Sequence, residues 1–239
     1  IGISTSASGG DGNISYEWYV NGIAINGATS ASYTPSSIYT SVAGTYTFTR
    51  KAKDGSCSDW QTSNGSYILI VNKAEVTLND MSPVAICKGE STRLEATLNG
   101  TPTGSVSYQW TPATGLSSNT GYAVTANPTT TTTYTVTATA NNNGCTAIST
   151  KTVTVTVNEL PTLNVTPTDA LCYGSNDGKL TVNVSGSAPD YKIYMGGISG
   201  TPQTTLTAAG SHEISPLTPG NYTIAVEDGN GCQTTSAVQ

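Results

Sequence analysis

Three stretches of this chain follow one sequence plan, and this internal repetition limits the possible folds more than any single motif. The segment ISYEWYVNG, which contains Trp18, matches VSYQWTPATG, which contains Trp110. A cysteine stands 11 positions after a tyrosine in both TYTFTRKAKDGSC and TYTVTATANNNGC, and 10 positions after it in YTIAVEDGNGC. Self-similarity of this kind indicates repeated structural units that fold on the same plan.

Alternating apolar and polar residues close each copy. SYILIVN ends the first copy, KTVTVTVN ends the second, and YTIAVED lies near the end of the third. Period-two alternation in β-branched residues predicts a strand with one buried face. Because such strands are separated by Gly, Asn, Pro and Ser clusters, in units of about 70–90 residues, we expect an all-β chain of tandem immunoglobulin-like β-sandwiches.

The repeats predict three domains. The expected ranges are 1–73 for an N-terminally truncated immunoglobulin-like sandwich, 74–158 for a second immunoglobulin-like or PKD-like sandwich, and 159–239 for a third sandwich. The junctions near Asn72 and Asn158 contain no long Gly/Ser or Pro tract, so we expect limited hinge freedom between neighbouring repeats. The abrupt start, IGISTSASGG, indicates an internal fragment of a longer protein.

Charge and hydropathy narrow the possible partners. The net charge is -6 and only 10% of the residues are charged, with the basic residues scattered, which argues against nucleic-acid binding. No run of about 18 apolar residues is present, so we expect no membrane insertion. Neighbouring repeats of the same chain are the expected contacts.

Four of the five cysteines are spaced as if each of two units held its own disulfide. Cys87 and Cys145 are 58 positions apart, and Cys172 and Cys232 are 60 positions apart. These intervals predict the disulfides Cys87–Cys145 and Cys172–Cys232, formed in an oxidising compartment. Each would stabilise its domain by roughly 4 kcal/mol in the chain-entropy treatment of loop closure.

Cys57 is left without a partner in this arrangement. In the second copy the first cysteine precedes Trp110 by 23 positions, and the same step back from Trp18 falls before Ile1. Truncation therefore accounts for the unpaired Cys57, and a reactive or intermolecular thiol is the alternative.

The third copy resembles a known family. The segments CYGSNDGKLTVNVSGSAPDYKIY and ISPLTPGNYTIAVEDGNGCQTT closely resemble the SprB-type repeat of gliding-motility and other surface adhesins in Bacteroidota, over about residues 165–239. The chain departs from that pattern in the middle strand, where it has Pro189, Asp190, Tyr191 and Tyr194 in place of a Pro-Tyr pair followed by Trp.

The second copy is similar to PKD-like or Ig-like repeats of large secreted Bacteroidota proteins, and the first copy is a looser match. The resemblance rests on ICKGESTRLEA, YQWTPATGLSS and TTTYTVTATANNNGC. It implies a non-catalytic repeat, spacer or weak multivalent adhesion module of a cell-surface or secreted adhesin, exported by the type IX system. The alternative is a carbohydrate-binding accessory region of a secreted polysaccharide-degrading enzyme.

An enzyme is not expected. The sequence has no nucleophile elbow, phosphate loop or His-Glu-x-x-His helix. The single histidine, His212, lies in a polar, turn-like segment with only Glu213 as a potential partner, so we interpret it as a solvated surface residue. No catalytic residue and no cofactor is predicted.

Carbohydrate binding would need exposed aromatic rings, which stack on sugar faces. Trp18 and Trp110 occupy equivalent repeat positions and are expected in the cores, and Trp60 aligns with an apolar strand position. The remaining candidates for ligand binding are Tyr39, Tyr173 and Tyr194. Their partners would be surface polysaccharides or glycans of a host or substratum.

The segment EDGNG ahead of Cys232 combines oxygen ligands with turn residues. Glu227, Asp228 and Asn230 are candidate calcium ligands, although they are too few for a full shell of six to eight oxygens. All three copies have small or Asx residues here, which favours a tight hairpin turn between the last two strands. We therefore predict a turn and assign no metal.

Overall fold

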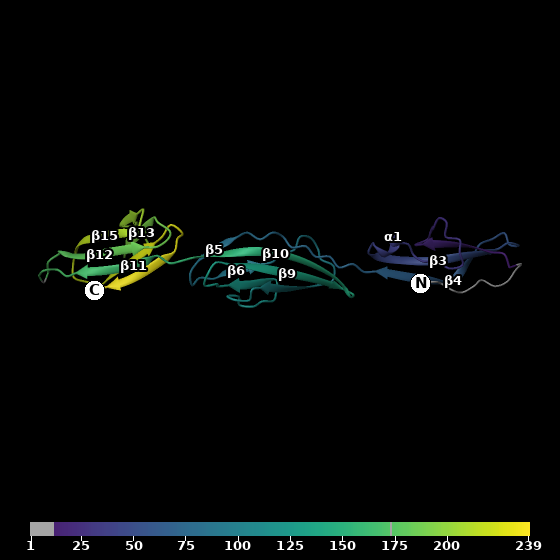
Figure 1. Cartoon of the computed structure of the whole chain (residues 1–239), viewed down its shortest axis with the longest axis horizontal. Helices are drawn as coiled ribbons and strands as arrows, with labels where there is room; N and C mark the ends of the chain where they lie inside the picture. The colour runs from purple at the N-terminus through teal and green to yellow at the C-terminus, as the bar shows by residue number, and fades with distance from the viewer. Residues whose placement is uncertain (1–11, 173) are drawn as a thin grey trace. The chain divides into compact units, whose positions relative to one another are not determined.

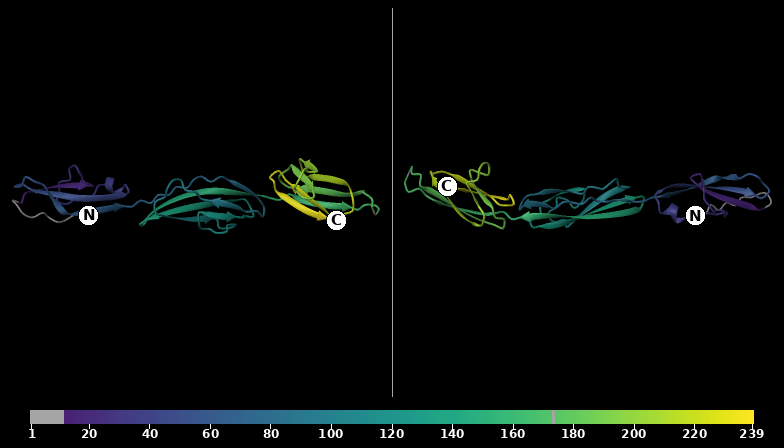
Figure 2. Two further views of the ribbon diagram at one scale, coloured as in Figure 1. Left: turned by 180° about the vertical axis from the view of Figure 1, so that it is seen from behind. Right: turned by 90° about the horizontal axis from the view of Figure 1, so that it is seen from above.

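The computed structural model describes residues 12–172 and 174–239, and this part of the chain is almost entirely β-structure (Figures 1 and 2). The one helical segment within these ranges is α1 (Ser37–Thr40). None of the described helical structure is long and apolar enough to cross a membrane. The predicted all-β class with tandem immunoglobulin-like sandwiches is confirmed.

The first copy forms a sheet in the order β2-β1-β3-β4. Its strands are β1 (Ile14–Val20), β2 (Ile23–Ala24), β3 (Gly44–Asp54) and β4 (Gln61–Val71). Trp18 and Phe48, each 1% exposed, form its core together with Val20 and Ala28. The Trp18 indole Nε1–H donates to the Ser30 carbonyl oxygen over 2.9 Å, so the ring is buried with its polar atom satisfied.

The second copy forms two sheets, β5-β10-β9-β7 and β6-β8. Its strands are β5 (Val84–Cys87), β6 (Thr92–Glu95), β7 (Ser105–Thr111), β8 (Ala123–Ala126), β9 (Thr132–Asn142) and β10 (Cys145–Asn158). Trp110 and Tyr134 are fully buried, and each ring donates a hydrogen bond to a backbone carbonyl oxygen. The core positions predicted for Trp18 and Trp110 are thus confirmed.

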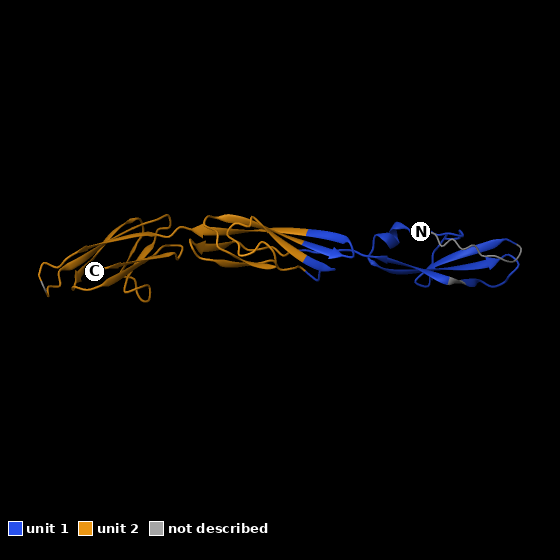
Figure 3. Cartoon of the chain, turned by 90° about the horizontal axis from the view of Figure 1, so that it is seen from below, with its two compact units in different colours: residues 1–77, 100–106, 139–148 blue, residues 78–99, 107–138, 149–239 orange. Residues whose placement is uncertain are grey.

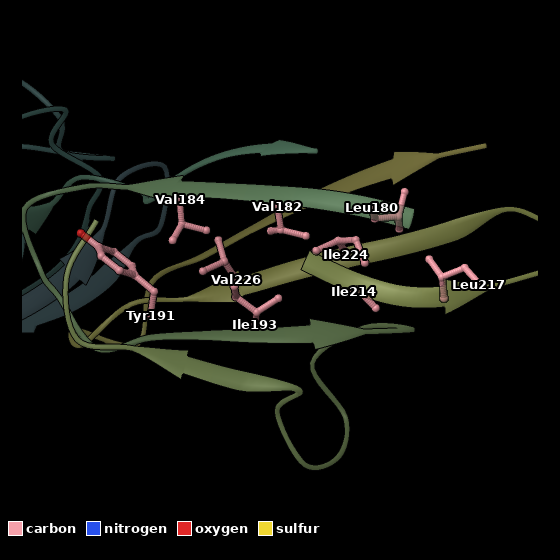
Figure 4. Packing of buried hydrophobic residues seen from close by; sticks show 9 residues of the cluster. All are labelled: Leu180, Val182, Val184, Tyr191, Ile193, Ile214, Leu217, Ile224 and Val226. Carbon is pink, nitrogen blue, oxygen red and sulfur yellow. The ribbon is translucent and has the colours of Figure 1, made fainter. Parts of the chain in front are cut away.

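The third copy also forms two sheets, β11-β12-β15 and β14-β13-β16-β17. Its strands are β11 (Thr162–Thr168), β12 (Gly178–Ser185), β13 (Tyr191–Met195), β14 (Thr204–Leu206), β15 (Gly210–Leu217), β16 (Tyr222–Glu227) and β17 (Gln233–Val238). Figure 4 shows its core, in which Val182 from one sheet lies opposite Ile193 and Val226 from the other.

Period-two alternation explains how the strands bury one face. In KTVTVTVN, Val153 and Val155 are buried, whereas Thr152 is exposed and Thr154, between the two valines, is half-buried. Burial of these β-branched side chains stabilises the fold by about 25 cal/mol per Å² of apolar surface removed from water. The strand prediction made from this alternation is confirmed.

The chain divides into two compact units (Figure 3). The first comprises residues 1–77, 100–106 and 139–148, and the second comprises residues 78–99, 107–138 and 149–239. Their boundary cuts through β9 and β10, because the ends of these strands next to their shared turn contact the segment after β4. Strands pair only with strands of the same range, within residues 14–71, 84–158 or 162–238 of the described chain. The domain boundaries expected at 73/74 and 158/159 remain predictions.

Candidate functional site

A disulfide between two successive sandwiches is the main covalent feature of the chain. Cys87, the last residue of β5, is bonded to Cys232, which directly precedes β17. Their Cα atoms are 5.5 Å apart, within the usual range for a disulfide, and they are separated by 145 positions in sequence. The bond therefore joins the second sandwich to the third.

The predicted Cys87–Cys145 disulfide is wrong, and strand direction is the reason. β5 runs parallel to β10, with Cys87 opposite Asn158 at the last residue of β10. Cys145 is the first residue of the same 14-residue strand. At about 3.3 Å per residue the two ends of β10 lie about 40 Å apart, far beyond the reach of a disulfide.

The predicted Cys172–Cys232 disulfide is also wrong. Thr234, just after Cys232, donates its Oγ1 hydrogen to the Pro161 carbonyl oxygen, which places this turn at the start of β11. Cys172 follows the end of β11, a strand of 7 residues that spans about 20 Å. Cys172 is an exposed free thiol at the other end of the sandwich.

The EDGNG segment is a turn that positions Cys232, as the sequence predicted. Asp228 is only 3% exposed, and its Oδ1 accepts hydrogen bonds from the backbone N–H groups of Asn230 and Cys232, each over 2.9 Å. The backbone N–H of Asp228 donates to the Cys232 carbonyl oxygen. This buried carboxylate thus organises the turn around the half-cystine.

The three calcium candidates already have protein partners or roles in the turn. Glu227 accepts hydrogen bonds from Lys192 Nζ over 2.8 Å and from Gln233 Nε2 over 3.0 Å. Asp228 Oδ1 is bonded to two backbone N–H groups. Among residues 12–172 and 174–239, no group of three or more His, Cys, Asp or Glu side chains is arranged to hold a metal ion.

The Glu227–Lys192 pair makes the pairing of β13 with β16 depend on pH. Hydrogen bonds from Lys192 and Gln233, together with the positive charge of Lys192, lower the pKa of Glu227 below the ordinary value of 4.5, and the hydrogen bond and charge of Glu227 raise the pKa of Lys192. A carboxylate with a lowered pKa stabilises the folded state above its unfolded pKa, and this contribution is lost as the pH falls through the lowered value.

Glu227→Gln is therefore expected to lower the melting temperature of the third sandwich at about pH 7 and to lower it less at about pH 3, because protonation of the carboxylate as the pH falls through its lowered pKa removes this contribution. Thermal unfolding followed by circular dichroism at both pH values measures this. Glu159→Gln is the matched control, because the Glu159 side chain is 61% exposed against 19% for Glu227. An equal loss at both pH values would show that the effect is not electrostatic.

Three cysteines are free thiols. Cys57 and Cys172 are exposed, and Cys145 is half-buried. The unpaired state expected for Cys57 agrees with this. Cys145 Sγ lies 3.4 Å from the Asn72 carbonyl oxygen, next to the turn between β9 and β10.

The predicted sugar-binding tyrosines do not form an exposed platform. Tyr194 is 7% exposed, so its ring is not available to stack on a sugar. Tyr39 lies in α1 and packs edge-on against Tyr46 and Phe48 in the first core. Tyr173 falls outside the described residues.

Two other aromatic rings are exposed instead. Trp60 is 40% exposed and precedes β4, so the apolar strand position predicted for it is wrong. Tyr122 is 55% exposed and precedes β8. Sequence reasoning missed Tyr122, since nothing in its local pattern distinguishes an exposed ring from a buried one.

His212 is half-buried within β15, opposite Val182 of β12. It therefore lies in a strand, and the turn-like position predicted for it is wrong. The neighbouring Glu213 is engaged elsewhere, since its Oε1 lies 3.2 Å from Lys179 Nζ and accepts a hydrogen bond from Ser215. Glu213, the partner that the sequence offered to His212, is therefore paired with other residues.

A pocket of about 390 Å³ opens at one end of the third sandwich. It is lined by residues that follow β11, begin β12 and connect β15 to β16, and Cys172 and Gln239 both border it. Its tyrosine, Tyr222, donates its hydroxyl hydrogen to the Thr218 carbonyl oxygen over 2.6 Å. Lys179 is paired with Glu213, so the polar groups named here are occupied by protein partners.

No family model matches the chain, and no curated protein matches it. Among solved structures, the chain is similar to the titin domains I67–I69, with 15% identity over 94% of this chain and 86% of that one and a TM-score of 0.45. It is also similar to extracellular domains 3–5 of Drosophila OTK, with 16% identity, coverage of 95% and 84%, and a TM-score of 0.39. Fibronectin(III)-like modules of Clostridium thermocellum CbhA match with 17% identity, coverage of 68% and 91%, and a TM-score of 0.33. Similarity at this level carries no argument about function.

Proposed function

We propose that this chain is a non-catalytic repeat and spacer region of a bacterial adhesin that is secreted or displayed on the cell surface. The disulfide from Cys87 to Cys232 carries the proposal, because it joins two successive sandwiches instead of closing a single core. Disulfides persist mainly in oxidising, extracytoplasmic compartments. The resemblance of residues 165–239 to SprB-type repeats supports the adhesin class, and the resemblance of residues 84–158 to repeats of large secreted Bacteroidota proteins supports export by the type IX system.

The position of the disulfide suits a chain that transmits tension. A force applied at the two ends passes from Cys87 to Cys232 through the sulfur–sulfur bond, so residues 88–231 lie outside the loaded path. The junction between β10 and β11, only three residues long, lies within this bypassed segment, so it bears no load while the disulfide is intact. A spacer with these properties keeps a binding region at a fixed distance from its anchor without needing a catalytic site.

Carbohydrate binding is the second candidate function, and the exposed rings of Trp60 and Tyr122 favour it. A glycan array followed by titration calorimetry on the full chain separates the two candidates. The spacer proposal expects no saturable binding to any glycan. Saturable binding that is lost in Tyr122→Ala or Trp60→Ala, while Tyr39→Ala retains it, would overturn the spacer proposal in favour of a carbohydrate-binding module.

A further inference from the structure

Cys145 and Cys232 occupy the same place in successive sandwiches. Each stands at the turn of the last hairpin, at or directly before the final strand, and each follows a segment of Asx and Gly residues. Cys232 is bonded to the last residue of the preceding sandwich's first strand. The corresponding partner of Cys145 would belong to the first strand of the first sandwich.

Cys145 lies at the junction between the first and second sandwiches, where a disulfide could link the two. The turn between β9 and β10 contacts the end of the first copy: Asn142 Nδ2 donates to the Lys73 carbonyl oxygen over 3.0 Å, and Cys145 Sγ lies 3.4 Å from the Asn72 carbonyl oxygen. Asn72 corresponds to Asn158, since each ends the terminal strand segment of its copy. Asn158 is the residue that pairs in register with Cys87.

The outer edge of β4 at residues 69–72 provides a second and independent observation. The outer edge of β10 is paired with the parallel strand β5, whereas no strand of residues 12–172 and 174–239 pairs with residues 69–72 on the outer edge of β4. The burial of the core-facing residues differs accordingly. Tyr67 and Leu69 are half-buried, while their counterparts Val153 and Val155 are 3% and 0% exposed.

We propose that the outer edge of β4 and the thiol of Cys145 form one docking site for a cysteine-bearing strand. The occupant is the first sandwich's own counterpart of β5, which would pair parallel to residues 69–72 and form a disulfide with Cys145. Cys87 precedes Trp110 by 23 positions, so the same spacing places this cysteine 23 positions before Trp18, ahead of Ile1. Each junction of the array would then carry one disulfide between neighbouring sandwiches.

The bond forms by thiol–disulfide exchange. A small-molecule disulfide such as oxidised glutathione first forms a mixed disulfide with the cysteine of the docking strand. The Cys145 thiolate then attacks the strand's sulfur, a new sulfur–sulfur bond forms, and glutathione leaves as a thiolate that takes up a proton. Parallel pairing with β4 would raise the local concentration of the strand's cysteine at Cys145 above that at the other two free thiols.

The first test uses a peptide with the sequence of residues 82–92, SPVAICKGEST, carrying glutathione on its cysteine, together with the full chain. Trypsin places Cys57, Cys145 and Cys172 in separate peptides, spanning residues 54–73, 94–151 and 152–179. We expect the peptide to label Cys145 about tenfold more than either of the others, which corresponds to about 1.4 kcal/mol. A scrambled peptide with the same composition serves as the control. Equal labelling by the two peptides would contradict recognition of the free strand.

The second test removes any dependence on peptide affinity. The chain is extended with residues 82–92 placed directly before Ile1, which sets the new cysteine 23 positions before Trp18. Non-reducing peptide mapping is expected to show this cysteine bonded to Cys145, and Cys145→Ser to leave it free. If the new cysteine stays free or pairs with Cys57, the proposal is overturned. Both tests read a specific disulfide, so their outcome is independent of whether the chain binds glycans.

Discussion

Reduction of the Cys87–Cys232 disulfide is expected to release about 500 Å of additional chain length under tension. The bond shields residues 88–231 from force applied at the two ends, and the bonded residues are 145 positions apart. An extended chain spans about 3.3–3.6 Å per residue, so unfolding both sandwiches in reducing solution adds this length. Single-molecule force spectroscopy on the full chain, held at its ends with and without dithiothreitol, measures the difference.

The substitution Cys87→Ser distinguishes a disulfide between the two sandwiches from disulfides within each sandwich. Cys87→Ser is expected to release the whole length of about 500 Å in oxidising solution, because it breaks the only bond that shields both sandwiches. If Cys87 were bonded to Cys145, the same variant would release only about 200 Å. Cys57→Ser is the matched control and is expected to leave the oxidised length unchanged, because Cys57 is a free thiol.

Trp110→Ala is expected to cost about 3–5 kcal/mol in the free energy of unfolding of the second sandwich. The Trp110 side chain is 0% exposed, and its Nε1–H donates to the Gly121 carbonyl oxygen over 2.9 Å. Truncation removes a large buried surface, leaves a cavity and deprives a carbonyl oxygen of its donor. Urea unfolding followed by circular dichroism, with the oxidised chain, measures the shift.

Trp60→Ala makes the same chemical change at an exposed position. The Trp60 side chain is 40% exposed, so its loss is expected to change the free energy of unfolding by no more than about 0.5 kcal/mol. A cost for Trp110→Ala as small as that for Trp60→Ala would contradict the assignment of Trp110 to a packed core.

The repeated pattern was sufficient to predict the strands and the core tryptophans. Alternation in KTVTVTVN identifies a strand and its buried face, because a strand exposes and buries side chains with a period of two. Equivalent positions of Trp18 and Trp110 identify them as core residues, because only a shared structural role explains a tryptophan at the same step of two copies. These inferences depend on local geometry that the sequence encodes directly.

The cysteine partners could not be predicted in this way. Equal spacing of Cys87 to Cys145 and of Cys172 to Cys232 reflects the repetition of the unit and does not report which sulfur atoms are close. Proximity depends on the direction of β5, which runs parallel to β10 and carries Cys87 to the end of the second sandwich that leads into the third. Strand direction of this kind is a long-range property that no local pattern records.

Tyr194 illustrates a second limit. Lys192 and Tyr194 share the face of β13 opposite Tyr191 and Ile193, yet Tyr194 is buried together with Tyr191 and Ile193. Burial from one side can be read from alternation, whereas burial from both sides depends on what the rest of the domain places over the strand.

Non-reducing tryptic mapping of the full chain tests the central claim most directly. Cleavage after lysine and arginine places each of the five cysteines in a different peptide, with Cys87 in residues 74–88 and Cys232 in residues 193–239. The structure predicts a disulfide between these two peptides, with Cys57, Cys145 and Cys172 open to alkylation before reduction. Disulfides that link residues 74–88 to 94–151 and residues 152–179 to 193–239 would contradict it.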